Sequence, residues 1–299
     1  MDPLHIEFLP QGLRRPIFLL AFAGWNDAAE SATLALRYLK GEWGGKRFAS
    51  LDPEEFYHFG LTRPFVRFKA GSQTEREITW PQNEFFVCQE GGLSRDVVIA
   101  LGIEPHLKWR AFCTAILGVA RQCEVTLVLT LGALLAEVPH TRPVRLTGAA
   151  QDAELAARLG IRPSRYEGPT GILGVLTTRF HEAGIPTSSL WANVPHYVSG
   201  TENYKAALAL VRRVMALLDD DRDLRELEEA AEGYDKQLNA IVKQNPKIAA
   251  YVRKLEAQDK ESAEPTPKEP SDLPPAADLV EEIERFLRQQ PRREESGEG

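Results

Sequence analysis

Short apolar runs alternate with helix-length amphipathic segments up to about residue 218, and this alternation limits the chain to few architectures. Each run has the length of a strand and is rich in aliphatic residues. The segment that follows it shows the 3.6-residue apolar spacing of a helix. Strands that alternate with helices form a mostly parallel sheet with helices on both faces. The sequence therefore predicts an α/β fold for residues 1–218.

Four apolar runs are predicted to be buried core strands, each followed by a helix or loop. The predicted strands are 16–24, 95–102, 125–134 and 187–194, and the predicted helices are 27–41, 107–122, 153–160 and 170–184. Residues 42–90 contain shorter β-like pieces such as FVRFKAG, REITWP and EFFVCQ. We expect this region to be a hairpin-type extension of the sheet.

The C-terminal part of the chain has a different composition. Residues 219–260 hold two polar, charged helical patterns, which predict a helical appendage. Residues 261–278 are acidic and rich in proline, which is typical of a linker. A short amphipathic helix and a disordered polar tail are predicted for residues 279–299.

Charge and composition argue against several functional classes. The formal net charge is −7, of which residues 260–299 carry −5, so no basic face is available to neutralise a nucleic-acid backbone. We expect no membrane segment, because the longest apolar stretch near the N-terminus is strand-sized and the start lacks a signal-peptide pattern. The three cysteines form no CxxC pair and fall in segments predicted to be buried. A cytoplasmic location fits this pattern.

The tripeptide Val-Pro-His occurs twice, at 138–140 and 194–196, each time just after a hydrophobic run. Loops that leave the carboxyl ends of parallel strands emerge at one edge of the sheet, where open α/β sheets bind ligands. Polar side chains follow all four predicted strands. The candidate ligand-binding rim consists of Asn26, Asp27, Glu104, His140, Arg142 and His196.

The rim residues also have structural interpretations. Asp27 with Glu30 fits a capping box for the next helix, and Glu104 fits a first helical turn. His140 and Arg142 fit a loop held by hydrogen bonds to backbone carbonyls. With two histidines from separate strand exits, a shared functional rim and a structural role remain equal alternatives. The rim is also a candidate oligomer contact, because aromatic residues flank the strand exits. These residues are Trp25, Trp109 and Trp191.

The sequence predicts no catalytic residue, metal site or cofactor. It contains no GxSxG elbow, no HExxH motif, no Walker A motif and no metal-ligand spacing of His and Cys. Gly168, Thr170 and Gly171 lie at a predicted helix start, where free backbone N–H groups bind anions, but the Walker lysine is missing. If the rim were catalytic, Asp27 or Glu104 would act as the acid or base.

Several segments, in their order along the chain, resemble a known family. They are FAGWNDAAESATLALRYL, LTRPFV, ITWP, GIEPHLKWRAF, GALLAEVPHTRPVRLTG, YEGPTGILGVL and SLWANVPHYV. This combination is similar to the bacterial branch of the proteasome assembly chaperone family, which includes the eukaryotic second chaperone. The resemblance covers residues 4–218 and continues into the helical tail.

The resemblance implies an α/β fold similar to nucleoside phosphorylases and peptidyl hydrolases, with a C-terminal helical piece. It also implies self-association as a trimer and a non-catalytic, assembly-chaperone-like role with an unidentified protein partner. The alternative from the residues themselves is an enzyme or small-molecule binder that uses the polar rim.

Overall fold

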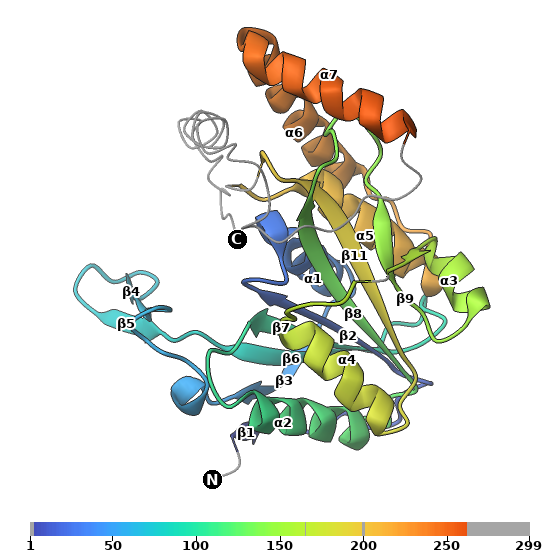
Figure 1. Cartoon of the computed structure of the whole chain (residues 1–299). Coiled ribbons are helices and arrows are strands. Elements are labelled where there is room, and N and C mark those ends of the chain that lie inside the picture. The colour runs from blue at the N-terminus through green and yellow to red at the C-terminus, as the bar shows by residue number, and fades with distance from the viewer. Residues whose placement is uncertain (1–2, 165, 199–200, 262–299) are drawn as a thin grey trace.

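A nine-stranded sheet with helices on both faces forms the body of the protein (Figure 1). The computed structural model describes residues 3–164, 166–198 and 201–261. The α/β fold class predicted from the sequence is confirmed. Nearly all of the predicted linker at 261–278, and the helix and tail predicted at 279–299, lie outside the described residues.

The strands of the sheet run in the order β1-β3-β6-β7-β2-β8-β11-β9-β10. Their bounds are β1 (Leu4–Ile6), β2 (Ile17–Ala23), β3 (Lys46–Leu51), β6 (Asn83–Cys88), β7 (Val97–Ile103), β8 (Leu127–Ala136), β9 (Leu146–Ala149), β10 (Arg162–Pro163) and β11 (Thr187–Pro195). The helices are α1 (Ser31–Glu42), α2 (Trp109–Gln122), α3 (Ala153–Leu159), α4 (Ile172–Glu182), α5 (Tyr204–Leu217), α6 (Arg225–Gln244) and α7 (Pro246–Glu261), with short 3-10 turns η1 (Ala28–Glu30) and η2 (Pro53–Glu55).

The four predicted core strands, β7, β2, β8 and β11, are parallel neighbours at the centre of the sheet. Strands β8 and β11 pair without interruption from Val128 with Thr187 to Ala136 with Pro195. The sheet as a whole is mixed, because β6 pairs antiparallel with β7 and β9 pairs antiparallel with β11. The carboxyl ends of all four central strands therefore meet at one edge.

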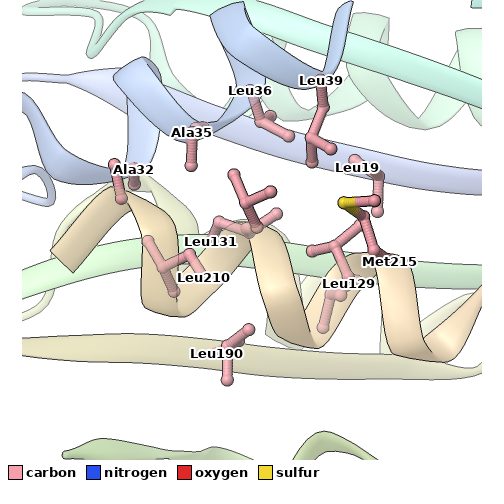
Figure 2. Close-up of a cluster of buried hydrophobic side chains, with 14 of the residues drawn as sticks. Leu19, Ala32, Ala35, Leu36, Leu39, Leu129, Leu131, Leu190, Leu210 and Met215 are labelled. Atoms are coloured by element: carbon pink, nitrogen blue, oxygen red, sulfur yellow. The ribbon is translucent and has the colours of Figure 1, made fainter. Parts of the chain in front are cut away.

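Both faces of the central strands are buried, which explains their nearly continuous apolar sequences. Strand β2 alternates its side chains between two cores. On one face, leucines of the sheet meet side chains of α1 and α5 (Figure 2); the labelled residues are Leu19, Leu129, Leu131, Leu190, Ala32, Ala35, Leu36, Leu39, Leu210 and Met215. On the other face, Phe22 packs edge-on against Phe112 of α2, and Phe18 against Phe180 of α4.

The region 42–90 extends the sheet as predicted, with β3 and β6 added in antiparallel fashion. Between them, β4 (Phe65–Phe68) and β5 (Arg76–Thr79) form a separate two-stranded hairpin. This hairpin stands off the body of the molecule (Figure 1). Its two connecting segments in the chain join it to β3 and β6.

The predicted helical appendage is present as α6 and α7, which lie over the carboxyl ends of β8 and β11 (Figure 1). Although α6 is rich in charge, its buried residues recur at alternating spacings of four and three, which produces one apolar stripe. They are Leu227, Ala231, Tyr234, Leu238 and Ile241. The last three of them join Ile248, Val252 and Leu255 of α7 and Tyr197 and Val198 after β11 in a small third core, whereas the first two belong to the core over α1 and α5.

Two glycines with opposite surroundings test the packing of this fold. A Cβ at Gly132 of β8 would lie 2.5 Å from ring carbons of Trp191, so Gly132→Ala is expected to destabilise the protein by about 1–3 kcal/mol. A Cβ at Gly118 of α2 meets nothing within 4 Å, so Gly118→Ala is expected to stabilise it by about 0.5–1 kcal/mol. Urea unfolding of both variants measures the difference. Equal stabilities would contradict the tight contact between β8 and β11.

Candidate functional site

At the exits of β2 and β7, polar residues form a hydrogen-bonded group with the start of α4. One carboxylate oxygen of Glu104 accepts hydrogen bonds of 2.7 Å from the Asn26 amide and of 2.7 Å from the backbone N–H of Ile172. The other accepts a 3.3 Å bond from the backbone N–H of Trp25. A carboxylate is stabilised at a helix N-terminus by the unpaired N–H groups and the helix dipole. Glu104 thus caps α4, a helix 68 residues further along the chain.

The predicted anion-binding loop lies at this same helix start. The backbone N–H of Ile172, which would serve an anion, already donates to Glu104. Gly171 is the N-cap of α4, and a Cβ there would collide with the side chain of Asn26. Gly168 and Thr170 lie in the loop that leads to the cap. An external anion at this position would have to compete with the carboxylate of Glu104.

Asp27 holds the first turn of α1. Its carboxylate accepts hydrogen bonds from the backbone N–H groups of Ala32, at 2.6 Å, and Thr33, at 3.1 Å, and from the Thr33 hydroxyl. Burial raises the pKa of Asp27, and these hydrogen bonds oppose that rise. The predicted helix start at 27 is wrong, because residues 28–30 form a 3-10 turn and α1 begins at Ser31. The Glu30 side chain contacts Arg37 and does not close a capping box.

The two Val-Pro-His segments come together at the exits of β8 and β11. The hydroxyl of Tyr197 accepts a 2.8 Å hydrogen bond from the backbone N–H of His140 and lies 2.8 Å from its Nδ1. His196 Nδ1 lies 3.3 Å from the carbonyl oxygen of Ala136, and its Nε2 lies 3.1 Å from the hydroxyl of Tyr251 on α7. Both histidines are buried. The tripeptide repeat therefore builds a platform on which α7 is seated.

Charged groups from α5, α6 and α7 surround this platform. Lys205 Nζ donates to the carbonyl of His140 at 2.6 Å and to Asp235 at 2.7 Å. The Thr141 hydroxyl donates to Glu256 on α7. Arg142 is exposed, and its backbone N–H donates to the carbonyl of Pro139 at 3.3 Å. These contacts fix the first Val-Pro-His loop beneath the appendage.

The structure thus places the six rim residues in two groups. Asn26, Asp27 and Glu104 hold the starts of α1 and α4, whereas His140, Arg142 and His196 lie at the platform below α6 and α7. Sequence reasoning missed Tyr197, although it directly follows the second tripeptide. It also missed the contributions of Lys205 and Tyr251, which come from later helices and carry no local signal.

The remaining sequence predictions concern tryptophans, cysteines and excluded classes. Trp25 is 49% exposed, whereas Trp109 and Trp191 are half-buried against the second core. The three cysteines are free and buried, and burial raises the pKa of Cys113 and Cys123 to about 11. Every helix within residues 3–164, 166–198 and 201–261 is too short or too polar to span a lipid bilayer. In the same residues, no cluster of three His, Cys, Asp or Glu side chains is arranged to hold a metal.

The buried His140 makes stability depend on pH. Burial lowers the pKa of His140 below its ordinary 6.5, although Asp235, Asn239 and Glu256 oppose this and Lys205 reinforces it. The neutral imidazole is therefore favoured in the folded state. The stability that it contributes is fully present above pH 6.5 and is lost as the pH falls through the lower folded-state pKa. Unfolding free energy is expected to fall by up to about 1.4 kcal/mol per pH unit from this group below pH 6.5.

Urea unfolding between pH 7 and pH 5 measures this dependence. The slope is expected to become shallower in His140→Gln and to stay unchanged in His181→Gln, because His181 is exposed on α4. Parallel slopes for wild type and both variants would show that His140 does not carry the effect.

Comparisons with known proteins give a consistent result. A sequence model described as the PAC2 family matches residues 21–242. A crystal structure of a PAC2 family protein from Streptomyces avermitilis is 43% identical, with a TM-score of 0.71, and the match covers 79% of this chain and 99% of that chain. A Mycobacterium tuberculosis protein described as a proteasome-assembly chaperone homologue is 41% identical, with the same TM-score and the same coverage of both chains.

A more distant structure shares the fold. It is PbaB from Pyrococcus furiosus, described as an archaeal proteasome activator, at 19% identity and a TM-score of 0.63, over 81% of this chain and 99% of that chain. A search of curated proteins found no match to this chain.

Proposed function

This chain belongs to the PAC2 family, and from that premise we propose that it is an assembly-chaperone-like protein that acts by binding other protein chains. The proposal is supported by the Mycobacterium tuberculosis relative, which is described as a proteasome-assembly chaperone homologue. We further propose that it works without catalysis, in the cytoplasm, as a homo-oligomer. Free, buried thiols support a reducing compartment.

The observation that carries the binding role is the β4–β5 hairpin. All residues of both strands are exposed, on both faces of the hairpin. Val66 pairs with Ile78, and Phe68 pairs with Arg76. Because side chains alternate along a strand, Val66, Phe68 and Ile78 share one face. They are 60%, 55% and 58% exposed, and this apolar face is called the hairpin face below.

An isolated two-stranded hairpin is marginally stable in water, because its strands lack a core to pack against. In β4–β5, the paired backbones are supplemented by an exposed ion pair of 2.9 Å between Lys69 and Glu75 and by Arg76 placed over the ring of Phe68. Contacts of this kind contribute little at an exposed site. Because these contacts add little stability and the apolar face is exposed, we infer that a protein surface covers the hairpin face.

We assign that surface to a second copy of the chain. The edge strand β1 and the residues after it expose a separate apolar group, formed by Ile6, Phe8 and Leu9. A hairpin face on one copy that docks on a different apolar group of the next copy is a head-to-tail contact. Repeated contacts of this kind close into a ring when the rotation between copies is a whole fraction of a turn, and one third of a turn gives the trimer implied by the family resemblance.

Replacing two residues of the hairpin face tests self-association. Phe68→Ser with Ile78→Ser is expected to weaken association by about tenfold or more for each residue, since buried apolar anchors dominate the binding free energy of an interface. Light scattering coupled to size exclusion, at a series of protein concentrations, measures the oligomer mass. The wild type should be trimeric and the double variant should dissociate to the monomer.

The matched control is Arg67→Gln with Glu77→Gln, which changes two paired residues on the opposite face of the same hairpin. This pair of changes should leave the mass unchanged. A monomeric wild type, or a double-serine variant with the wild-type mass, would refute the self-contact.

A further inference from the structure

A groove of about 570 Å³ lies between α5, α6 and the chain that leads into β9. Its lining includes Leu146 of β9, Leu208 of α5 and Ala231 of α6. All three side chains belong to the core over α1 and α5. Val144 and Ala209, which are half-buried, add to the apolar lining. At this groove the main core of the protein is therefore open to an apolar occupant.

Charged side chains of both signs line the same groove. The cations come from α5 and the carboxylates from α6; they are Lys205, Arg212, Arg213, Glu228, Glu232 and Asp235. Lys205 pairs with Asp235 at 2.7 Å, and a second pair of 2.7 Å joins Arg212 to α6. An occupant of one charge sign would be attracted to one of these helices and repelled by the other. The groove therefore suits an occupant that has an apolar face and charges of both signs.

One segment of this chain, beyond the last described residue, has this composition. Residues 279–288 read LVEEIERFLR, and their apolar positions 279, 283, 286 and 287 have the spacing of one helix face. Asp278 with Glu281 fits a capping box at the start, and Pro291 fits a stop after the end. The polar positions are glutamates and arginines. A helix of this length is marginal in water by itself, so its apolar face needs a protein surface.

The end of α7 brings this segment within reach of the groove. The hydroxyl of Thr141 donates to Glu256 on α7, and Thr141 is two residues from Pro143 in the groove lining. From Glu256 the helix continues for about 7.5 Å to its end. Figure 1 shows this end on the same side of the view as β9. A flexible chain as long as residues 262–278 spans about 21–25 Å on average, and prolines extend such a chain further. The connection is therefore long enough for docking without a movement of α7.

The covalent connection also lowers the affinity that the groove must supply. A segment held by a linker that matches the span is present at an effective concentration of about millimolar. A separate protein at a lower concentration would need a proportionally tighter affinity to occupy the same groove. The segment of the same chain therefore has the advantage over any other occupant of the same chemistry.

We propose that the groove between α5 and α6 binds residues 279–288 of the same chain as an amphipathic helix. The apolar face around Ile283 and Phe286 packs on the apolar lining, and the glutamates and arginines lie beside the charges of α5 and α6. The docked segment covers this surface and excludes other protein chains from it until it is released. This contact is separate from the hairpin face, so each of the two contacts is tested independently of the other.

Photocrosslinking of the full chain tests this docking directly. With p-benzoylphenylalanine in place of Phe286, irradiation is expected to link the segment to residues 143–146, 205–213 or 228–235, which mass spectrometry of the digest identifies. The product should have the mass of a single chain on a denaturing gel. The same probe in place of Arg285, on the polar face of the predicted helix, should give at least tenfold less of these links.

Variants of the segment and of the groove complete the test. Ile283→Ser should lower the yield from the probe at 286 by about tenfold, since an apolar anchor is lost, whereas Glu284→Gln should leave it unchanged. Ala209→Phe fills the groove and should have the same effect as Ile283→Ser, whereas Ala111→Phe, at an exposed position of α2, should not. Links to other parts of the chain, a product with the mass of two chains, or a full yield in Ile283→Ser would overturn the proposal.

Discussion

The uninterrupted parallel pairing of β8 with β11 determines where the polar groups of this protein meet. Because the pairing continues to Ala136 and Pro195, the two strands end level with each other. Each strand is followed by a histidine after proline, and Tyr197 joins the two exits by its hydrogen bonds to His140. An antiparallel pairing would have sent the two tripeptides to opposite ends of the sheet. The platform under α7 is thus a direct consequence of strand direction.

Helices α6 and α7 of the appendage cover the polar groups that meet at the exits of β8 and β11. The apolar stripe of α6 packs on α5 and α7, and its burial stabilises the position of the helices. The same stripe carries Tyr234, whose buried hydroxyl has no hydrogen-bond partner among the described residues. Tight apolar packing and unmet polar groups therefore coexist along one helix. An unpaired buried polar group of this kind costs about 1–3 kcal/mol of stability.

Most of the fold could be predicted from the sequence, because it depends on local apolar periodicity. The strand β2 and the helix α2 follow directly from runs that are apolar or amphipathic over their own length. The candidate site was harder to predict. From the sequence, Glu104 is predicted to lie in the first turn of the helix that follows it. In the structure it caps α4, and no residue near position 104 indicates its hydrogen bond with the backbone of Ile172. Likewise, Tyr197 and Tyr234 share a small core only because α6 packs against the exit of β11, which is a long-range packing event.

The proposed chaperone-like role depends on the hairpin face, because the two strands of this hairpin have no core of their own to pack against. Hydrogen–deuterium exchange of residues 61–80, measured over a range of protein concentrations, tests that self-contact most directly. The account predicts that amides of β4 and β5 become protected as concentration rises, while those of β2 and β8 stay protected throughout. Rapid exchange in the hairpin at every concentration would contradict it.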